Sequence, residues 1–284
     1  MLLLISMPPL KQILDRFYEE YNFPERLIHD PISFPRSYAC PEDREVAGFM
    51  AACLAYGKVG LFRPVIGKIL APAGDHPASF FRNFSMKRDG RFLRGISYRF
   101  NREQDILCLI YIVSRALKQW GSLKNLFYHF YREDHVDIKI ALQGFIDYLT
   151  ALDTTPVYKS AEKPYGLLQL LPSPRKGSAC KRLNLFLRWM VRNRDIDLGI
   201  WDRIPASKLI IPLDTHILRI AQCIGLTDRT SPDWRTAGSI TVSLRKLDPE
   251  DPLKYDFALC HQGISGLCRG RRFPESCSAC SLSL

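Results

Sequence analysis

The chain has 284 residues, of which 46% are hydrophobic and 24% charged, and its 40 Lys and Arg against 29 Asp and Glu give a formal net charge of +11. The apolar content suffices for the core of one large domain or two small ones and excludes a mainly disordered chain, and no apolar stretch approaches the roughly 18–20 residues of a membrane-spanning helix. The positive charge favours a polyanionic partner, with nucleic acid ahead of an acidic membrane surface.

Most of the chain has the sequence pattern of helices. The apolar stretches 45–55 and 106–120 lack the alternation of exposed strands, and Pro and Gly mark the joints between segments. The apolar run 209–213 contains Pro212, which a central strand would not accept. We therefore predict an all-α fold.

A basic and aromatic segment follows the first long helix. Residues 82–102 contain seven Lys and Arg and one acid, Asp89, and aromatic residues are interleaved among them from Phe80 to Phe100. This composition suits a surface that holds phosphates while bases stack on it. An exposed loop whose aromatic side chains turn into the core explains the same pattern equally well.

The segment 172–192 predicts a turn followed by an amphipathic helix. Prolines and Gly177 make the turn, and Ser178 is in position to act as the N-cap. The helix has one apolar stripe, formed by Leu183, Phe186, Leu187, Met190 and Val191, and Lys181 shares the opposite face with Arg188 and Arg192. A helix N-terminus beside a column of cations binds phosphate well, although a merely solvated basic face has the same pattern.

Lys181 has the properties of a candidate nucleophile. In the first helical turn, beside Arg182 and Arg188, its ammonium form is disfavoured by the helix dipole and by like charges. Both effects favour the neutral amine, which is the nucleophilic form.

A second amphipathic helix is expected from Asp214 to the C-capping Gly225. Asp214 occupies the N-cap position, where it is either a simple cap or a carboxylate held at the edge of a cleft. We interpret His216 as a packing or hydrogen-bonding residue.

These segments together resemble the helix-hairpin-helix DNA glycosylase superfamily. The stretch Leu213-Asp-Thr-His-Ile-Leu-Arg219 is similar to the motif that carries the catalytic aspartate in the endonuclease III branch. The pattern from Ser178 to Arg192, followed by Pro-Leu-Asp-Thr-His, is closer still to an uncharacterised bacterial family of that superfamily. The specific resemblance covers about the last 120 residues.

The resemblance implies a two-lobed helical fold and base-excision chemistry on double-stranded DNA. One lobe would span residues 46–197, and the other would combine 1–45 with 198–284. A damaged nucleotide would be flipped into the cleft between the lobes, where Lys181 attacks C1′ of the sugar and Asp214 assists. The implied DNA contacts are Arg175, Lys176, Gly177, Ser178, Arg182, Arg188, Arg269, Arg271 and Arg272.

The hairpin departs from the superfamily pattern Leu-Pro-Gly-x-Gly-x-Lys. It has one glycine and a later lysine, so that Lys176 is the rival of Lys181 by position in the chain. We prefer Lys181, because the archaeal 8-oxoguanine glycosylase branch also carries its lysine in the helix that follows an atypical hairpin.

Nine cysteines without an export signal indicate a reducing compartment, and we expect a cytoplasmic, monomeric protein. Cys40, Cys53, Cys108, Cys180 and Cys223 are scattered and are interpreted as small buried hydrophobes. Endonuclease III-like enzymes hold a [4Fe–4S] cluster with four C-terminal cysteines. Here Cys260, Cys268, Cys277 and Cys280 give the spacing C-x7-C-x8-C-x2-C. A cluster, zinc with His261 and no metal at all remain open.

The sequence therefore predicts a DNA-repair glycosylase, with or without lyase activity. Two other hypotheses fit the same features. The first is a nucleic-acid-binding protein that retains the fold without the chemistry, and the second is a scaffold for protein contacts.

Overall fold

The structure, a computed structural model of the chain, describes residues 9–266, 268 and 280–282. This part of the chain is built from α-helices and short 3-10 helices, and its β-type pairing is limited to two isolated bridges. The predicted all-α class is confirmed. None of the helices in the described ranges is long and apolar enough to cross a membrane.

The first half of the chain contains α1 (Leu10–Glu19), α2 (Phe23–Leu27), α3 (Ser33–Arg36), α4 (Pro41–Leu54), α5 (Val59–Leu70), η1 (Ala71–Ala73), α6 (Pro77–Arg82), α7 (Met86–Asp89), η2 (Gly90–Leu93), α8 (Glu103–Trp120) and α9 (Leu123–Phe130). The second half contains α10 (Lys139–Ala151), α11 (Thr155–Tyr158), α12 (Tyr165–Leu170), η3 (Pro174–Lys176), α13 (Lys181–Val191), η4 (Ala206–Lys208), α14 (Thr215–Cys223), α15 (Trp234–Arg245) and α16 (Asp256–Ile264).

The helix α4 is a central element of the fold and packs against α3, α6 and α13. Its residues from Val46 to Leu54 are all buried, as expected for a helix that is apolar around its whole circumference. Gly48 lets α13 come close, because a Cβ atom there would lie 3.0 Å from Cε of Met190. The predicted helix at 45–55 is thus a core element.

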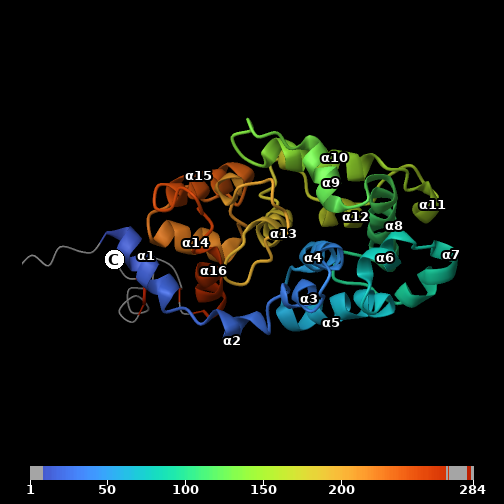
Figure 1. The fold of residues 1–284 in the computed structure, drawn as a ribbon, viewed down its shortest axis with the longest axis horizontal. Coiled ribbons are helices and arrows are strands. Elements are labelled where there is room, and N and C mark those ends of the chain that lie inside the picture. Colours follow the sequence, from blue (N-terminus) through green and yellow to red (C-terminus); the bar gives the residue numbers. More distant parts are fainter. Residues whose placement is uncertain (1–8, 267, 269–279, 283–284) are drawn as a thin grey trace, which may run out of the picture.

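The helix α13 lies near the middle of an elongated molecule, with α14, α15, α16 and α1 towards one end and α6, α8, α11 and α12 towards the other (Figure 1). The apolar stripe predicted from the sequence is buried on it, as Leu183, Phe186, Leu187, Met190 and Val191 each have at most 7% exposure. A helix in this position is covered by other helices on several sides. The side of α13 opposite the apolar stripe is therefore exposed or buried according to the residues that pack against it.

A buried carboxylate fixes the start of α9. Glu45 of α4 accepts hydrogen bonds from the backbone N–H groups of Leu123 (2.7 Å) and Lys124 (2.8 Å) and from Nε1–H of Trp201 (3.0 Å). Burial raises the pKa of Glu45 to about 7, although all three donors favour the charged form. One side chain thus joins α4, α9 and the segment after α13.

The N-terminal helix packs beside the C-terminal ones. Asp15 of α1 accepts hydrogen bonds from Nζ of Lys254 (2.7 Å) and from the hydroxyl of Tyr255 (2.6 Å), just before α16. By contrast α3, which the predicted lobes group with the C-terminal half, packs on α4.

Candidate active site

Lys181 is the first residue of α13 and follows a turn with two left-handed residues. Gly177 has a φ of 78°, and Cys180, the N-cap residue, has a φ of 47°. The hydroxyl of Ser178 accepts a hydrogen bond from the N–H of Cys180 (3.2 Å), and no side chain caps α13. The prediction that Ser178 is the N-cap is wrong, because the left-handed conformation of Cys180 delays the helix until Lys181.

The turn before Lys181 is anchored on α10. Oε1 of Gln143 accepts the backbone N–H of Arg175 (2.7 Å) and the hydroxyl of Ser173 (3.1 Å), and the Arg175 guanidinium pairs with Asp147 at 2.9 Å. Three of the residues expected to contact DNA are exposed here: Arg175, Lys176 and Gly177. The turn therefore presents a fixed backbone and two cations to the solvent.

The two carboxylate oxygens of Asp214 have different partners, since one caps α14 and the other faces Lys181. Oδ1 accepts the backbone N–H groups of His216 and Ile217, both at 2.9 Å, which confirms the predicted N-cap of α14. Oδ2 lies 3.7 Å from Nζ of Lys181. The side chains of Lys181 and Asp214 are 30% and 22% exposed, so that solvent reaches both. The structure brings Lys181, and not Lys176, to Asp214.

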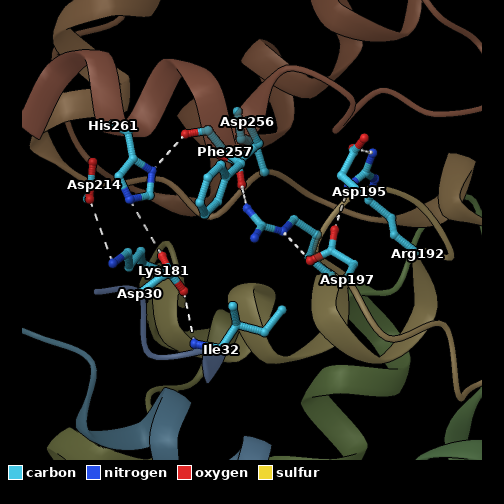
Figure 2. A network of polar contacts seen from close by, with 12 residues as sticks. Asp30, Ile32, Lys181, Arg192, Asp195, Asp197, Asp214, Asp256, Phe257 and His261 are labelled. Atoms are coloured by element: carbon cyan, nitrogen blue, oxygen red, sulfur yellow. Dashed lines mark hydrogen bonds and ion pairs between the residues drawn. The ribbon is translucent and has the colours of Figure 1, made fainter. Parts of the chain in front are cut away.

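Two further residues border this pair, as Figure 2 shows. Nδ1 of His261 in α16 lies 3.0 Å from the carbonyl oxygen of Phe257, and Nε2 of the same ring lies 3.8 Å from Oδ2 of Asp30. Oδ1 of Asp30 accepts the N–H of Ile32 at 2.9 Å. Burial lowers the pKa of His261, and the charge of Asp30 acts in the opposite direction. Asp30 carried no signal in the sequence, because it lies far from Lys181 along the chain, between α2 and α3.

His216 has the structural role expected for it. Its Nδ1 lies 3.0 Å from the carbonyl oxygen of Gly263, which also accepts a hydrogen bond from the Arg219 guanidinium (2.9 Å). A Cβ atom at position 263 would lie 2.7 Å from Cβ of His216, so the glycine allows α16 to approach α14. This contact sets the distance between the helices that carry Asp214 and His261.

Cys260 is the residue before His261 in α16. Burial of its thiol and the nearby carboxylate of Asp214 raise the pKa of the thiol well above the usual value. Within the described residues no group of three or more potential ligands could hold a metal ion. Cys277 lies outside the described residues, and so do Arg269, Arg271 and Arg272. Of the scattered cysteines, Cys53, Cys108 and Cys180 are buried as expected, whereas Cys40 is exposed.

The predicted basic face of α13 is wrong for Arg188 and Arg192, each of which is 2% exposed. Arg188 pairs with Asp197 (3.2 Å) and Asp256 (2.5 Å). Arg192 pairs with three carboxylates, those of Asp195, Asp197 and Asp251, at distances of 2.5 to 3.1 Å. Both guanidiniums neutralise buried acids, so Arg188 cannot contact a phosphate.

Arg182 also turns inward, with 8% exposure. Its guanidinium donates to the carbonyl oxygens of Cys53 and Gln169, near the C-terminal ends of α4 and α12, and it lies 5.0 Å from the ring of Tyr56. A cation suits this position because helix C-termini carry partial negative charge. The expectation that Arg182 contacts DNA is therefore corrected. The charged partner of Lys181 is Asp214.

A sequence profile of the family described as "Protein of unknown function (DUF2400)" matches residues 30–265. The chain belongs to this family. The DUF2400 match begins at Asp30 and includes Lys181, Asp214 and His261, and it ends before Cys268. Comparisons with curated proteins and with solved structures give no significant match.

Proposed function

We propose that this DUF2400 chain is a DNA glycosylase with AP-lyase activity, related to the helix-hairpin-helix superfamily, in which Lys181 is the nucleophile. The observation that carries the proposal is the 3.7 Å approach of Lys181 Nζ to Asp214 Oδ2 at the starts of two helices. An amine and a carboxylate in one partly exposed site are the two groups that this chemistry needs.

Each group has a definite task in the reaction. The lone pair of Nζ forms a bond to C1′ of the flipped nucleotide, while the electrons of the glycosidic bond leave with the base, which takes up a proton. The ionised carboxylate of Asp214 stabilises the positive charge that develops on the sugar, and its Oδ2 then accepts the proton that Nζ loses and passes it to the departing base. The C1′–O4′ bond then breaks as O4′ takes a proton from water, which opens the sugar ring and leaves a protonated imine between Nζ and C1′. Loss of a C2′ proton to water from this imine expels the 3′ phosphate, which is the lyase step.

In this proposal the turn before α13 binds the DNA backbone. The first turn of α13 has no side-chain cap, and helix N-termini in this state attract phosphate. Lys176 and Gly177 are exposed next to it. The net charge of +11 gives a general attraction to the duplex. The buried Arg182 and Arg188 take no part in this binding.

Covalent trapping tests the proposal. Duplexes with an abasic site, 8-oxoguanine or an oxidised pyrimidine are incubated with the protein and borohydride, which adds hydride to the imine carbon and fixes the protein to the DNA. We expect a trapped complex with at least one lesion, lost in Lys181→Ala and still formed, with weaker duplex binding, in Lys176→Ala.

Two outcomes would overturn the assignment. Trapping that survives in Lys181→Ala but is lost in Lys176→Ala would move the nucleophile to the rival lysine. No trapping or excision with any lesion, together with salt-dependent duplex binding, would support the non-catalytic binding protein instead.

A further inference from the structure

The segment 90–102, between α7 and α8, displays two aromatic rings on the surface. Phe92 is 44% exposed and Phe100 56%, whereas Phe84 and Tyr98 in the same basic and aromatic region have 5% exposure each. Some aromatic rings of the region therefore belong to the core, whereas the rings of Phe92 and Phe100 lie on the surface.

Each exposed ring is paired with a guanidinium. Cζ of Arg91 lies 4.9 Å from the centroid of the Phe92 ring, and Cζ of Arg99 lies 5.3 Å from that of Phe100. Aromatic rings next to arginines are the usual platform for bases of single-stranded nucleic acid, which stack on the rings while phosphates pair with the cations. A ring covered by a charged group is poorly suited to enter the hydrocarbon of a membrane.

Hydrogen bonds hold the turn that carries Arg99 and Phe100 in place. Tyr98 and Asn101 exchange two backbone hydrogen bonds of 2.8 Å, so that Arg99 and Phe100 form the tip of a tight turn. Nδ2 of Asn101, a residue with 1% exposure, donates to the carbonyl oxygen of Gly166 at 2.7 Å. A rigid display loses little conformational entropy when a ligand binds.

The segment has four exposed arginines, none of which forms an ion pair with a residue in the described ranges: Arg91, Arg94, Arg99 and Arg102. Asp89 is close enough for its charge to interact with that of Arg91. Asp89 is buried and paired with Arg88, and Glu103 accepts the N–H of Gly95 at 2.7 Å. These cations are therefore available to phosphates.

The segment lies close to residues that pack against α13. The ring of Tyr56 lies 5.8 Å from the Arg99 guanidinium and 5.0 Å from that of the buried Arg182, the residue next to Lys181.

From these observations the geometry points to a single-stranded nucleic acid site formed by Arg91, Phe92, Arg94, Arg99, Phe100 and Arg102. This inference goes beyond the proposed function and does not depend on it, since none of these residues takes part in the chemistry at Lys181. Bases stack on Phe92 and Phe100, and the arginines hold the phosphates between them.

Fluorescence anisotropy with a labelled oligothymidylate and the full chain tests the site. We expect Phe92→Ala/Phe100→Ala to weaken binding about tenfold or more, as the loss of base–aromatic stacking predicts. Arg91→Gln/Arg94→Gln should make the slope of log K against log salt shallower by about 1.4, because each phosphate contact on a single strand contributes about 0.7.

Matched controls separate the site from general effects. Val242→Ala removes an exposed apolar side chain on α15, and Arg16→Gln/Arg132→Gln removes two exposed charges elsewhere. Both should bind the oligothymidylate as the parent does. Lys181→Ala should also bind normally, which separates this site from the proposed catalysis.

The proposal is overturned if the phenylalanine double variant binds as tightly as the parent, or if the control charge variant loses as much affinity as Arg91→Gln/Arg94→Gln. It is equally overturned if the parent binds phosphatidylserine vesicles and not the oligothymidylate.

Discussion

Nη1 of Arg188 in α13 lies 2.5 Å from Oδ2 of Asp256 at the start of α16, and both side chains are almost completely buried. The pair joins the helix that begins with Lys181 to the helix that carries His261. The candidate site is therefore supported from behind by a charge pair that no solvent reaches.

Replacing Arg188 by Met should lower the free energy of unfolding by about 3–5 kcal/mol, because the buried carboxylate of Asp256 would lose its ion-pair partner and that of Asp197 would keep only Arg192. Urea unfolding followed by circular dichroism measures this loss. Arg175→Met, which breaks the exposed pair with Asp147, should cost less than about 1 kcal/mol. Equal losses in the two variants would contradict the role given to Arg188.

Stability should fall as the pH rises from about 4.5 to 7, owing to Glu45. Its pKa is about 7 in the folded chain and 4.5 as the ordinary value, so the folded state binds the proton more tightly and the unfolded state releases it first. The contribution of this residue is thus complete below pH 4.5 and is lost as the pH approaches 7. Its slope is at most about 1.4 kcal/mol per pH unit.

Unfolding titrations at a series of pH values would measure this effect, and Glu45→Gln should flatten the dependence in that range. Glu42→Gln, a change at an exposed neighbour in the same helix, serves as the control. If the parent and Glu45→Gln show the same pH dependence, the raised pKa of Glu45 is refuted.

Two variants should distinguish the capping role of Asp214 from its role beside Lys181. Asp214→Ala removes the N-cap of α14 and should destabilise the chain by about 0.5–2 kcal/mol. Asp214→Asn keeps a good capping oxygen and should retain stability within about 0.5 kcal/mol, yet lose trapping activity because Lys181 loses its carboxylate. Melting temperature and borohydride trapping are measured together. A fully active Asp214→Asn would leave Asp214 as a cap alone.

Gly263→Ala should lower stability by about 1–3 kcal/mol, because its new Cβ would lie 2.7 Å from Cβ of His216 and push α16 away from α14. Gly238→Ala in α15 is the matched change, since no atom lies within 4 Å of its new Cβ. That variant should gain about 0.5–1 kcal/mol from better helix propensity. Thermal unfolding of both distinguishes the signs, and a stabilised Gly263→Ala would contradict the close approach.

Local patterns in the sequence predicted what depends on neighbours along the chain. The apolar stripe that includes Leu183 and Phe186 is buried, and Asp214 caps its helix, because helical periodicity and capping act within a few residues. The adjacency of Lys181 and Asp214 was expected from a resemblance between motifs, and neither residue alone indicates it.

The polarity of the second face of α13 could not be predicted in this way. Arg188 looks like a solvent-facing residue in the helical pattern, and its burial depends on Asp256, which lies 68 positions further along the chain. Ser178 failed as a cap because Cys180 adopts a left-handed conformation that is uncommon for residues other than glycine. Asp30 joined the site through tertiary packing alone.

The carboxylates around Arg188 and Arg192 also bear on how the chain folds during synthesis. Asp251 and Asp256 are synthesised well after α13, so Arg188 and Arg192 lack these two partners until the C-terminal part of the chain has been made. A fragment that ends at residue 197 would contain the two cations without these acids. In such a fragment Asp195 and Asp197 would be the remaining acidic partners of the two arginines, so we expect it to be less stable than the full chain.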